Sequence, residues 1–302
     1  MDRIKYYLGA WIQPGTIQIP IHTKSFMQNK LFWYEGPSVT DVPNFPFHYG
    51  MLSPCFWWHH GQNGMILDIP CLTISADGID NESLPALAKV RRLADPSGSI
   101  LCPMEYARHW GYIKESRKCS IHWKHKLNSC VWRGNPTGVQ TLTDNLRILF
   151  CKKYGSIYDV GITDTWGRFP VEYIKTPLTI AEMLKYKYII SLEGNDKDSG
   201  LNWKLASNSL VVMPHPTVES WLMEGLLKPY EHYVPLAADC SDLPRVLAWC
   251  QDHEAECLQI IENANAFMRQ FDDLAEEKRI FEQIKKHYLQ SFTFKTLNNY
   301  FI

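Results

Sequence analysis

The amino-acid sequence predicts an α/β protein with two lobes, on three observations. The chain has 302 residues, and a single domain usually has roughly 100 to 200, so two domains are expected. Hydrophobic residues make up 45% and charged residues 21%, as in an ordinary globular protein. From residue 127 onward, short apolar runs alternate with helical patterns, which is typical of a parallel sheet with crossover helices.

The first third of the chain is rich in aromatic residues and interrupted by proline, so its elements are weakly specified. Strands are predicted over 65–69 and 71–75. A helix is predicted over 84–93, because apolar residues recur there at near-helical spacing. We therefore assign 1–126 to an N-terminal lobe, which the last helix, 276–302, could complete.

The regular alternation fills the rest of the chain. Strands are expected over 129–132, 157–162, 188–192 and 210–213. Helices are expected from a cap at Thr143 and Asp144 to Gly155, over 179–186, 201–206 and 218–226, and over two long amphipathic stretches, 243–270 and 274–291. We assign 127–275 to a Rossmann-like lobe.

Charge and cysteine content exclude several classes of protein. Lys and Arg total 31 against 32 Asp and Glu, so no bulk field favours nucleic acid as a partner. The longest uncharged stretch, 42–67, contains several Pro and Gly and is not a membrane span. No secretory signal is recognised, so cytoplasmic residence is expected. The nine cysteines show no CxxC pair and predict free thiols, and no zinc pattern is present.

Two loops that follow predicted strands suit a phosphate group. Arg133 follows a strand directly, beside Gly134 and Gly138, although it could also be a surface arginine at a turn. The loop 193–200 leads into a helix that carries Lys204 in its first turn. Neither loop matches GxGxxG or GxxxxGK[ST], which argues against nicotinamide-dependent oxidation and P-loop phosphoryl transfer.

The tripeptide Asp196-Lys-Asp198 has two readings. It matches the DxD with which some sugar transferases chelate a divalent metal, but a match of three residues is weak. The simpler interpretation is that both carboxylates cap the start of the following helix. Aromatic residues, 13% of the chain, slightly favour a carbohydrate ligand.

Several segments of the C-terminal half have a recognisable wording: Tyr186–Asn195, Ser199–Met213, Glu219–Gly225, and His232–Leu236 with Ser241–Leu243; Arg133-Gly134 and Arg108-His-Trp110 also fit. In these segments the chain resembles the CAP10-like glycosyltransferases, family 90, and most closely their bacterial branch. The resemblance is strong over about 128–270 and weak before 100.

This resemblance implies a GT-B fold, in which two Rossmann-like lobes flank the active site. It implies inverting sugar transfer without an essential metal or other cofactor. The residues that it assigns to the nucleotide-sugar donor are Arg133, Gly134, Thr137, Glu193, Gly194, Ser199, Asn202, Lys204 and Glu219. Several relatives have a basic residue where this chain has Asn202, and Lys204 is the substitute that we consider. On the acceptor side it suggests Arg108, Trp57 and Trp58.

The general base of the family is an Asp in a D-x-P-like context, and two positions fit. Asp41, before Val-Pro-Asn-Phe-Pro, resembles the motif more closely, whereas the spacing of Asp68 to the strand 72–75 favours that residue. Either could instead cap a turn.

The function implied is transfer from a nucleotide sugar, such as UDP-glucose or UDP-xylose, to a hydroxyl of a surface glycan or lipopolysaccharide. The enzyme would be cytoplasmic, with at most peripheral contact at the inner face of the membrane. Two alternatives stay open: an inactive relative that only binds glycans, and a metal-dependent transferase that uses Asp196 and Asp198.

Overall fold

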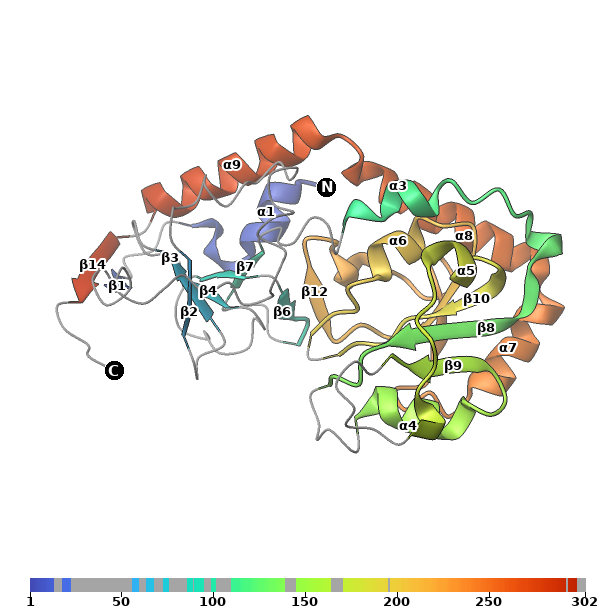
Figure 1. Ribbon diagram of the computed structural model, residues 1–302. Coiled ribbons are helices and arrows are strands. Elements are labelled where there is room, and N and C mark those ends of the chain that lie inside the picture. The colour runs from blue at the N-terminus through green and yellow to red at the C-terminus, as the bar shows by residue number, and fades with distance from the viewer. Residues whose placement is uncertain are drawn as a thin grey trace. The chain divides into compact units, whose positions relative to one another are not determined.

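The computed structural model describes most of the second half of the chain and parts of the first (Figure 1). The described residues are 1–13, 18–22, 56–59, 64–67, 73–75, 86–88, 90–94, 99–101, 110–138, 145–163, 171–194, 196–291 and 293–297.

Packing divides the chain into two units. Unit 1 comprises Met1–Ala107, Thr217–Gly225 and Asp273–Ile302, and unit 2 comprises Arg108–Pro216 and Leu226–Asp272. The first boundary between the units thus falls after residue 107, whereas the boundary predicted from the sequence falls after residue 126. The C-terminal segment packs with unit 1, and so does the short segment 217–225.

Unit 2 is built on a parallel sheet of five strands, which confirms the predicted α/β class. The strands are β8 (Leu127–Gly134), β9 (Asp159–Ile162), β10 (Tyr186–Ile190), β11 (Leu210–Pro214) and β13 (Val234–Leu236). Their order is β13-β11-β10-β8-β9, and every neighbouring pair is parallel. The strands read as continuous apolar runs because side chains on both faces of the sheet are buried.

The α-helices of unit 2 are α3 (Ile113–Ser116), α4 (Leu146–Tyr154), α5 (Ile180–Met183), α6 (Leu201–Leu205), α7 (Leu243–Asp252) and α8 (Glu254–Met268). Two of them begin at a side-chain cap. The side chain of Asn145 caps α4, and Thr179 forms a capping box with Glu182 at the start of α5. The predicted caps Thr143 and Asp144 lie outside the described residues.

The single helix predicted over 243–270 is wrong in one respect, because the chain breaks at His253. That residue has φ −123° and ψ 50°, which is not helical. Its backbone N–H donates to the carbonyl of Trp249, and its ring Nδ1 lies 2.8 Å from the same oxygen. The local bonds end α7 and let α8 start in a new direction.

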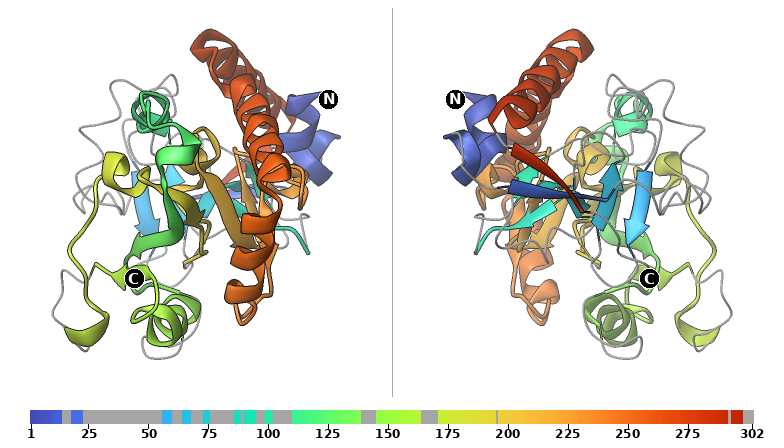
Figure 2. Two further views of the ribbon diagram at one scale, coloured as in Figure 1. Left: turned by 90° about the vertical axis from the view of Figure 1, so that its right-hand side faces the viewer. Right: turned by 90° about the vertical axis from the view of Figure 1, so that its left-hand side faces the viewer.

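Unit 1 contains a mixed sheet. Its strands are β2 (Phe56–His59), β3 (Gly64–Leu67), β4 (Thr73–Ser75), β5 (Ala86–Ala88) and β7 (Ser99–Leu101). β3 pairs antiparallel with β2 and with β4. β5 pairs parallel with β4 and with β7. A further parallel pair joins β1 (Gln18–His22) to β14 (Thr293–Leu297), as the right-hand view of Figure 2 shows. The GT-B arrangement of two Rossmann-like lobes stays a prediction.

Two predicted helices are strands in the structure, and they pair with each other. Residues 84–93 contain β5 and β6 (Val90–Arg92), and residues 218–226 begin with β12 (Val218–Ser220) and end in a 3₁₀ turn (Glu224–Leu226). β6 and β12 run antiparallel, with Arg91 directly opposite Glu219. The pairing satisfies the backbone groups of both segments, so tertiary contact overrides local helical spacing.

A buried ion pair fixes this ladder. The Arg91 guanidinium donates from Nε to Glu219 Oε1 at 2.6 Å, and the two side chains are only 5% and 4% exposed. Tyr6 donates its hydroxyl to the other Glu219 oxygen, and Arg91 also donates to the Tyr6 carbonyl at 2.8 Å. Glu219, assigned to the nucleotide sugar by resemblance, therefore lies in unit 1 and holds that unit together.

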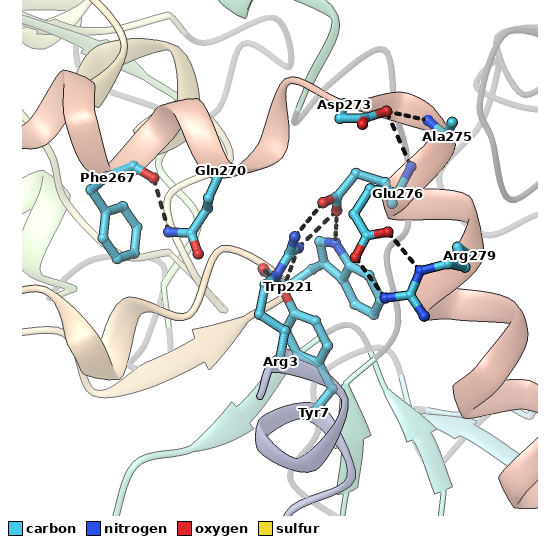
Figure 3. Close-up of polar contacts among 10 residues, drawn as sticks. Arg3, Tyr7, Trp221, Phe267, Gln270, Asp273, Ala275, Glu276 and Arg279 are labelled. Atoms are coloured by element: carbon cyan, nitrogen blue, oxygen red, sulfur yellow. Dashed lines mark hydrogen bonds and ion pairs between the residues drawn. The ribbon is translucent and has the colours of Figure 1, made fainter. Parts of the chain in front are cut away.

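A second buried cluster connects α1 (Arg3–Leu8) near the N-terminus and α9 (Leu274–Ser291) near the C-terminus to the segment 217–225 (Figure 3). Glu277, on α9, accepts from Trp221 Nε1 at 2.6 Å and from Arg3 NH2 at 2.9 Å. Arg3 lies on α1, and its guanidinium also donates to the Tyr7 hydroxyl. The Tyr7 and Trp221 rings stack with centroids 3.9 Å apart. Unit 1 is thus assembled from three separate stretches of chain.

The described cysteines agree with the prediction of free thiols. The cysteines that the structure describes, at positions 119, 130, 151, 240, 250 and 257, carry free thiols. None of the described helices has the length and apolar character that a bilayer-crossing helix requires.

We predict that Glu219→Gln destabilises unit 1 by about 3 to 5 kcal/mol, because it leaves the Arg91 charge buried without its partner. Chemical denaturation followed by fluorescence would measure the change. The double variant Arg91→Met/Glu219→Met should unfold at a higher denaturant concentration than Glu219→Gln, since no charge remains to be desolvated. Equal stability of Glu219→Gln and wild type would contradict a structural role for the pair.

Candidate functional site

The candidate site lies at one edge of the unit 2 sheet. After β8 the chain enters β9 on one side, and the later strand β10 returns to the other side of β8. Such a reversal of strand order is the point at which open parallel sheets bind ligands, outside the carboxyl ends of the strands. Because β8 and β10 are parallel neighbours, the loops that follow them emerge at the same edge. These are the two loops that the sequence analysis singled out.

Arg147, in the first turn of α4, joins the two loops. Its NH1 donates to Asn135 O at 3.1 Å and to Thr137 Oγ1 at 3.2 Å, both in the loop after β8. Its Nε and NH2 donate to the carbonyls of Glu193 and Leu192, at 3.1 and 2.8 Å, after β10. The sequence analysis missed this residue, although one signal was available: a lone cation among apolar neighbours at a helix start.

Gly194 is needed for the close approach of that guanidinium. A Cβ at this position would lie 2.9 Å from Arg147 Cζ and 3.0 Å from both terminal nitrogens. The group that approaches Gly194 this closely is the guanidinium of Arg147. Thr137 and Glu193 were also predicted to bind the nucleotide sugar. In the structure, each of them accepts a hydrogen bond from Arg147.

Lys204 and Asp198 form a buried ion pair behind the second loop. The Lys204 ammonium group donates to Asp198 Oδ2 and, at 3.0 Å, to the carbonyl of Ile190. Asp198 also accepts from Ser191 Oγ at 2.6 Å and from Gly200 N at 2.8 Å. Lys204 is therefore engaged with Asp198, and neutralising a diphosphate would require this ion pair to open.

The same contacts bear on the two interpretations of Asp196-Lys-Asp198. Asp198 accepts the backbone N–H of Gly200, the residue before α6, although no side chain caps the helix itself. Both of its oxygens already accept hydrogen bonds. Metal chelation by Asp196 and Asp198 would have to displace these donors.

Asn202 presents an unpaired buried amide. The residue is 0% exposed, and its Oδ1 accepts from Lys197 Nζ at 3.0 Å. That contact leaves Nδ2 as a donor without a hydrogen-bond partner among the described residues. A buried donor without a partner costs about 1 to 3 kcal/mol, so the group points to a missing acceptor. It lies at the position where the resemblance expects a donor-binding residue.

The Arg133 guanidinium is engaged in contacts within unit 2, and these contacts do not support the diphosphate-binding role predicted for it. Its Nε donates to Thr176 O, its NH1 to the carbonyls of Trp132 and Asp159, and its NH2 to Asp159 Oδ1 at 2.6 Å. Four of the five guanidinium N–H groups are thus occupied within unit 2. The arginine ties β8 to β9, and contact with a diphosphate would require these bonds to break.

The remaining predicted residues are placed only in part. Ser199 lies just before α6, and Gly134 ends β8, where a Cβ would lie 2.6 Å from the Trp132 ring. Trp57 and Trp58 lie on β2. Asp41, Asp68 and Arg108 lie outside the described residues.

We predict that Asp198→Asn makes the stability of unit 2 less dependent on pH in acid. Burial raises the pKa of this carboxyl, but the charges of Lys204 and Arg147 and the hydrogen bonds from Lys204 and Ser191 hold it below its ordinary value. The ionised Asp198 carboxylate stabilises the folded state fully above about pH 4, which is near the ordinary Asp pKa. This stabilisation is lost as the pH falls through the pKa that Asp198 has in the folded protein. Melting temperatures between pH 2.5 and 7 would measure it.

The control for this experiment is Asp252→Asn, which removes an exposed carboxylate at the end of α7. This variant should follow the wild-type curve. Asp198→Asn should melt below wild type at pH 7, because Lys204 is left buried without a counter-charge, and approach it in acid. A constant difference across the whole pH range would rule out the ion pair as its source.

The chain is similar in sequence to several known proteins. The chain is 32% identical over 191 residues to O-glucosyltransferase LpsA of Dichelobacter nodosus, covering 62% of this chain and 57% of that protein. It is 27% identical over 151 residues to protein O-glucosyltransferase 2 of Danio rerio, covering 49% and 29%. It is 29% identical over 186 residues to protein 179R of Invertebrate iridescent virus 6, covering 49% and 16%.

The chain therefore spans just over half of the bacterial relative and less than a third of the other two. The model of glycosyl transferase family 90 matches residues 106–296, more than half of the chain and all of unit 2. That region contains both loops, Arg147 and Asn202. On this match, the chain belongs to glycosyl transferase family 90.

Proposed function

We propose that this glycosyltransferase binds a nucleotide-sugar donor in unit 2, at the edge where β8 and β10 end. The observation that carries the proposal is the unpaired Nδ2 of Asn202, buried beside two loops that Arg147 clamps together. A diphosphate offers the acceptor oxygens that this amide lacks. The donor is a UDP-sugar, with UDP-glucose favoured over UDP-xylose because relatives carry the name O-glucosyltransferase.

The leaving diphosphate is stabilised by hydrogen-bond donors rather than by a metal. Asn202 supplies an amide, and the backbone N–H groups of the two loops supply further donors in a partly desolvated site. Arg147 adds a fixed positive charge that is already held by four contacts, so little reorganisation accompanies the reaction.

The sugar is transferred by direct displacement with inversion. A carboxylate from the first third of the chain, Asp41 or Asp68, takes the proton of the acceptor hydroxyl while that oxygen attacks the anomeric carbon. The bond to the diphosphate breaks, and the nucleoside diphosphate leaves with the electron pair. Arg108, Trp57 and Trp58 are the residues that we propose on the acceptor side. The acceptor is a hydroxyl of a surface glycan or lipopolysaccharide, met at the inner face of a membrane.

Two alternatives are tested by simple assays. An inactive glycan-binding relative would bind no nucleotide sugar and hydrolyse none. A transferase that depends on Asp196 and Asp198 for a metal would lose activity with a chelator. The contacts of Asp198 with Lys204 and Ser191 make the second alternative the weaker one.

We predict that Asn202→Asp weakens UDP binding at least tenfold. The change removes the unpaired donor and places a negative charge near the diphosphate, and a hydrogen bond to a charged group contributes about 1.5 to 3 kcal/mol. Folding should be preserved, because an Asp at this position can still accept from Lys197. Calorimetric titration with UDP would measure the affinity.

The matched control is Asn263→Asp, which adds the same charge on α8, and its UDP affinity should equal that of wild type. The chelator EDTA should leave wild-type turnover unchanged. Unaltered UDP affinity in Asn202→Asp would place the diphosphate elsewhere in the protein.

We predict that Asp41→Asn lowers turnover about 10²- to 10⁴-fold, the usual span for loss of a general base, with little change in UDP affinity. Asp68→Asn should then be mild, unless that carboxylate holds a loop, in which case the melting temperature would fall together with activity. Initial rates, UDP titrations and melting curves on both variants decide between them. An active Asp41→Asn beside a well-folded, donor-binding but inactive Asp68→Asn would identify Asp68 as the base.

A further inference from the structure

Positive charge is concentrated in one segment of unit 2, residues 112–127, which we call the basic segment. It has a single acid, Glu115, and its basic residues are Lys114, Arg117, Lys118, Lys124 and Lys126. The whole chain, by contrast, has 31 Lys and Arg against 32 Asp and Glu. Local clustering of positive charge in a chain that is nearly neutral favours an electrostatic contact with an anionic partner.

The basic segment runs along the outside of unit 2. It begins at Tyr112, forms α3, and reaches the start of β8 at Leu127. α3 packs on α6 and α5, and the chain continues from α3 along the periphery of the unit to β8 (Figure 1). Lys126 is buried, whereas the other four basic residues of the segment are exposed, together with His122 and His125. The charge therefore lies on the surface.

Three of the exposed lysines have no counter-charge of their own. Lys114, Lys118 and Lys124 form no ion pair and no side-chain hydrogen bond with the residues that the structure describes. Other exposed cations of unit 2, such as Lys228 and Arg245, pair with a carboxylate three residues away. The three lysines thus carry charge that an external anion can neutralise.

Two carboxylates that lie beside the basic segment are engaged with other cations. Asp272 pairs with Arg117 at 2.7 Å. Glu254 pairs at 3.1 Å with Lys187, whose ammonium group lies 5.0 Å from the centre of the Trp123 ring. Because each acid already has a partner, neither neutralises the three lysines.

The backbone that carries these lysines is held in place by the rest of unit 2. Nδ2 of Asn208 donates to the carbonyls of Ile121 and Cys119, at 2.9 and 3.3 Å. The ammonium group of the buried Lys126 donates to Ser209 Oγ at 2.8 Å. Both contacts tie the segment to the chain that leads into β11. Because the segment is already ordered, little backbone entropy is lost when a partner binds to it.

Exposed apolar side chains lie at both ends of the basic segment. Tyr112 is 46% exposed before α3, and Leu127 is 53% exposed at the start of β8. Aromatic and aliphatic side chains beside cations are typical of protein surfaces that lie in the headgroup region of a bilayer. An anionic bilayer offers both negative charge and an apolar layer, whereas the backbone of a nucleic acid offers only the charge. The combination therefore favours a lipid surface as the partner.

We propose that the basic segment is a docking surface for a membrane that contains anionic phospholipid. Its lysines lie against the headgroups, and Tyr112 and Leu127 enter the boundary between headgroups and acyl chains. The need for an anionic partner comes from the unpaired lysines; the choice of a bilayer also rests on the proposed function, in which the acceptor is met at a membrane. The contact keeps the enzyme at the surface that holds its acceptor.

The test is co-sedimentation of the full chain with vesicles of phosphatidylcholine, alone or mixed with phosphatidylglycerol in a ratio of about two to one. We expect the partition coefficient to be at least about tenfold higher for the mixed vesicles. Raising NaCl from about 0.05 M to about 0.5 M should abolish the preference, because salt screens charges at the surface. Equal partition onto both kinds of vesicle would overturn the proposal.

The decisive variant is Lys118→Gln/Lys124→Gln, which should lower the partition coefficient at least about tenfold, since each lysine near an anionic surface contributes about fivefold. Its melting temperature should not change, because neither side chain contacts the described residues. The matched control, Lys153→Gln/Lys228→Gln, removes the same charge from two other exposed positions of unit 2 and should bind like wild type.

Equal vesicle binding by the two double variants would show that net charge, and not the basic segment, attracts the lipid. Displacement of the protein from mixed vesicles by a DNA duplex at an equal concentration of phosphate would make nucleic acid the preferred partner. Either result would overturn the proposal. UDP titration is a separate measurement: normal UDP affinity without vesicle binding refutes only the docking surface, whereas vesicle binding without UDP affinity refutes only the proposed function.

Discussion

The pairing of β8 with β10 is the contact on which the functional part of this protein depends. These strands are neighbours in the sheet although α4, β9 and α5 separate them in the sequence. Because the pairing is parallel, the chain leaves both strands at one edge, and right-handed crossovers send α4 and α6 to opposite faces. Two loops distant in the sequence are thereby held side by side, close enough for one arginine to bond with both.

Buried ion pairs stabilise the framework of each unit by itself. Lys204 and Asp198 in unit 2, and Arg91 and Glu219 in unit 1, are pairs in which each charge compensates its partner. A lone buried charge is costly, so the loss of one member destabilises more than the loss of both. For this reason, charged residues that the sequence suggested as ligand-binding groups form ion pairs with other residues of the protein. Arg133 is a third example, since Asp159 and three carbonyls surround its guanidinium.

Polar atoms left without partners are more informative about ligands than charged residues are. Most buried polar groups in proteins are hydrogen-bonded, so an exception at a site asks for an explanation. Nδ2 of Asn202, beside the two loops that Arg147 joins, is such an exception among the described residues.

The sequence by itself determined the α/β class, four of the five parallel strands of unit 2 and the two loops after β8 and β10, because continuous apolar runs and helix caps are local signals. It also carried the family resemblance that the comparisons confirm. Only the tertiary structure decided that 90–92 and 218–220 are strands, since they pair across 128 residues of sequence and each segment alone has helical spacing. It likewise decided that Arg147, and not Arg133, forms hydrogen bonds with both loops. Which arginine lies between the loops depends on the order of the strands in the sheet, and no local sequence pattern encodes that order.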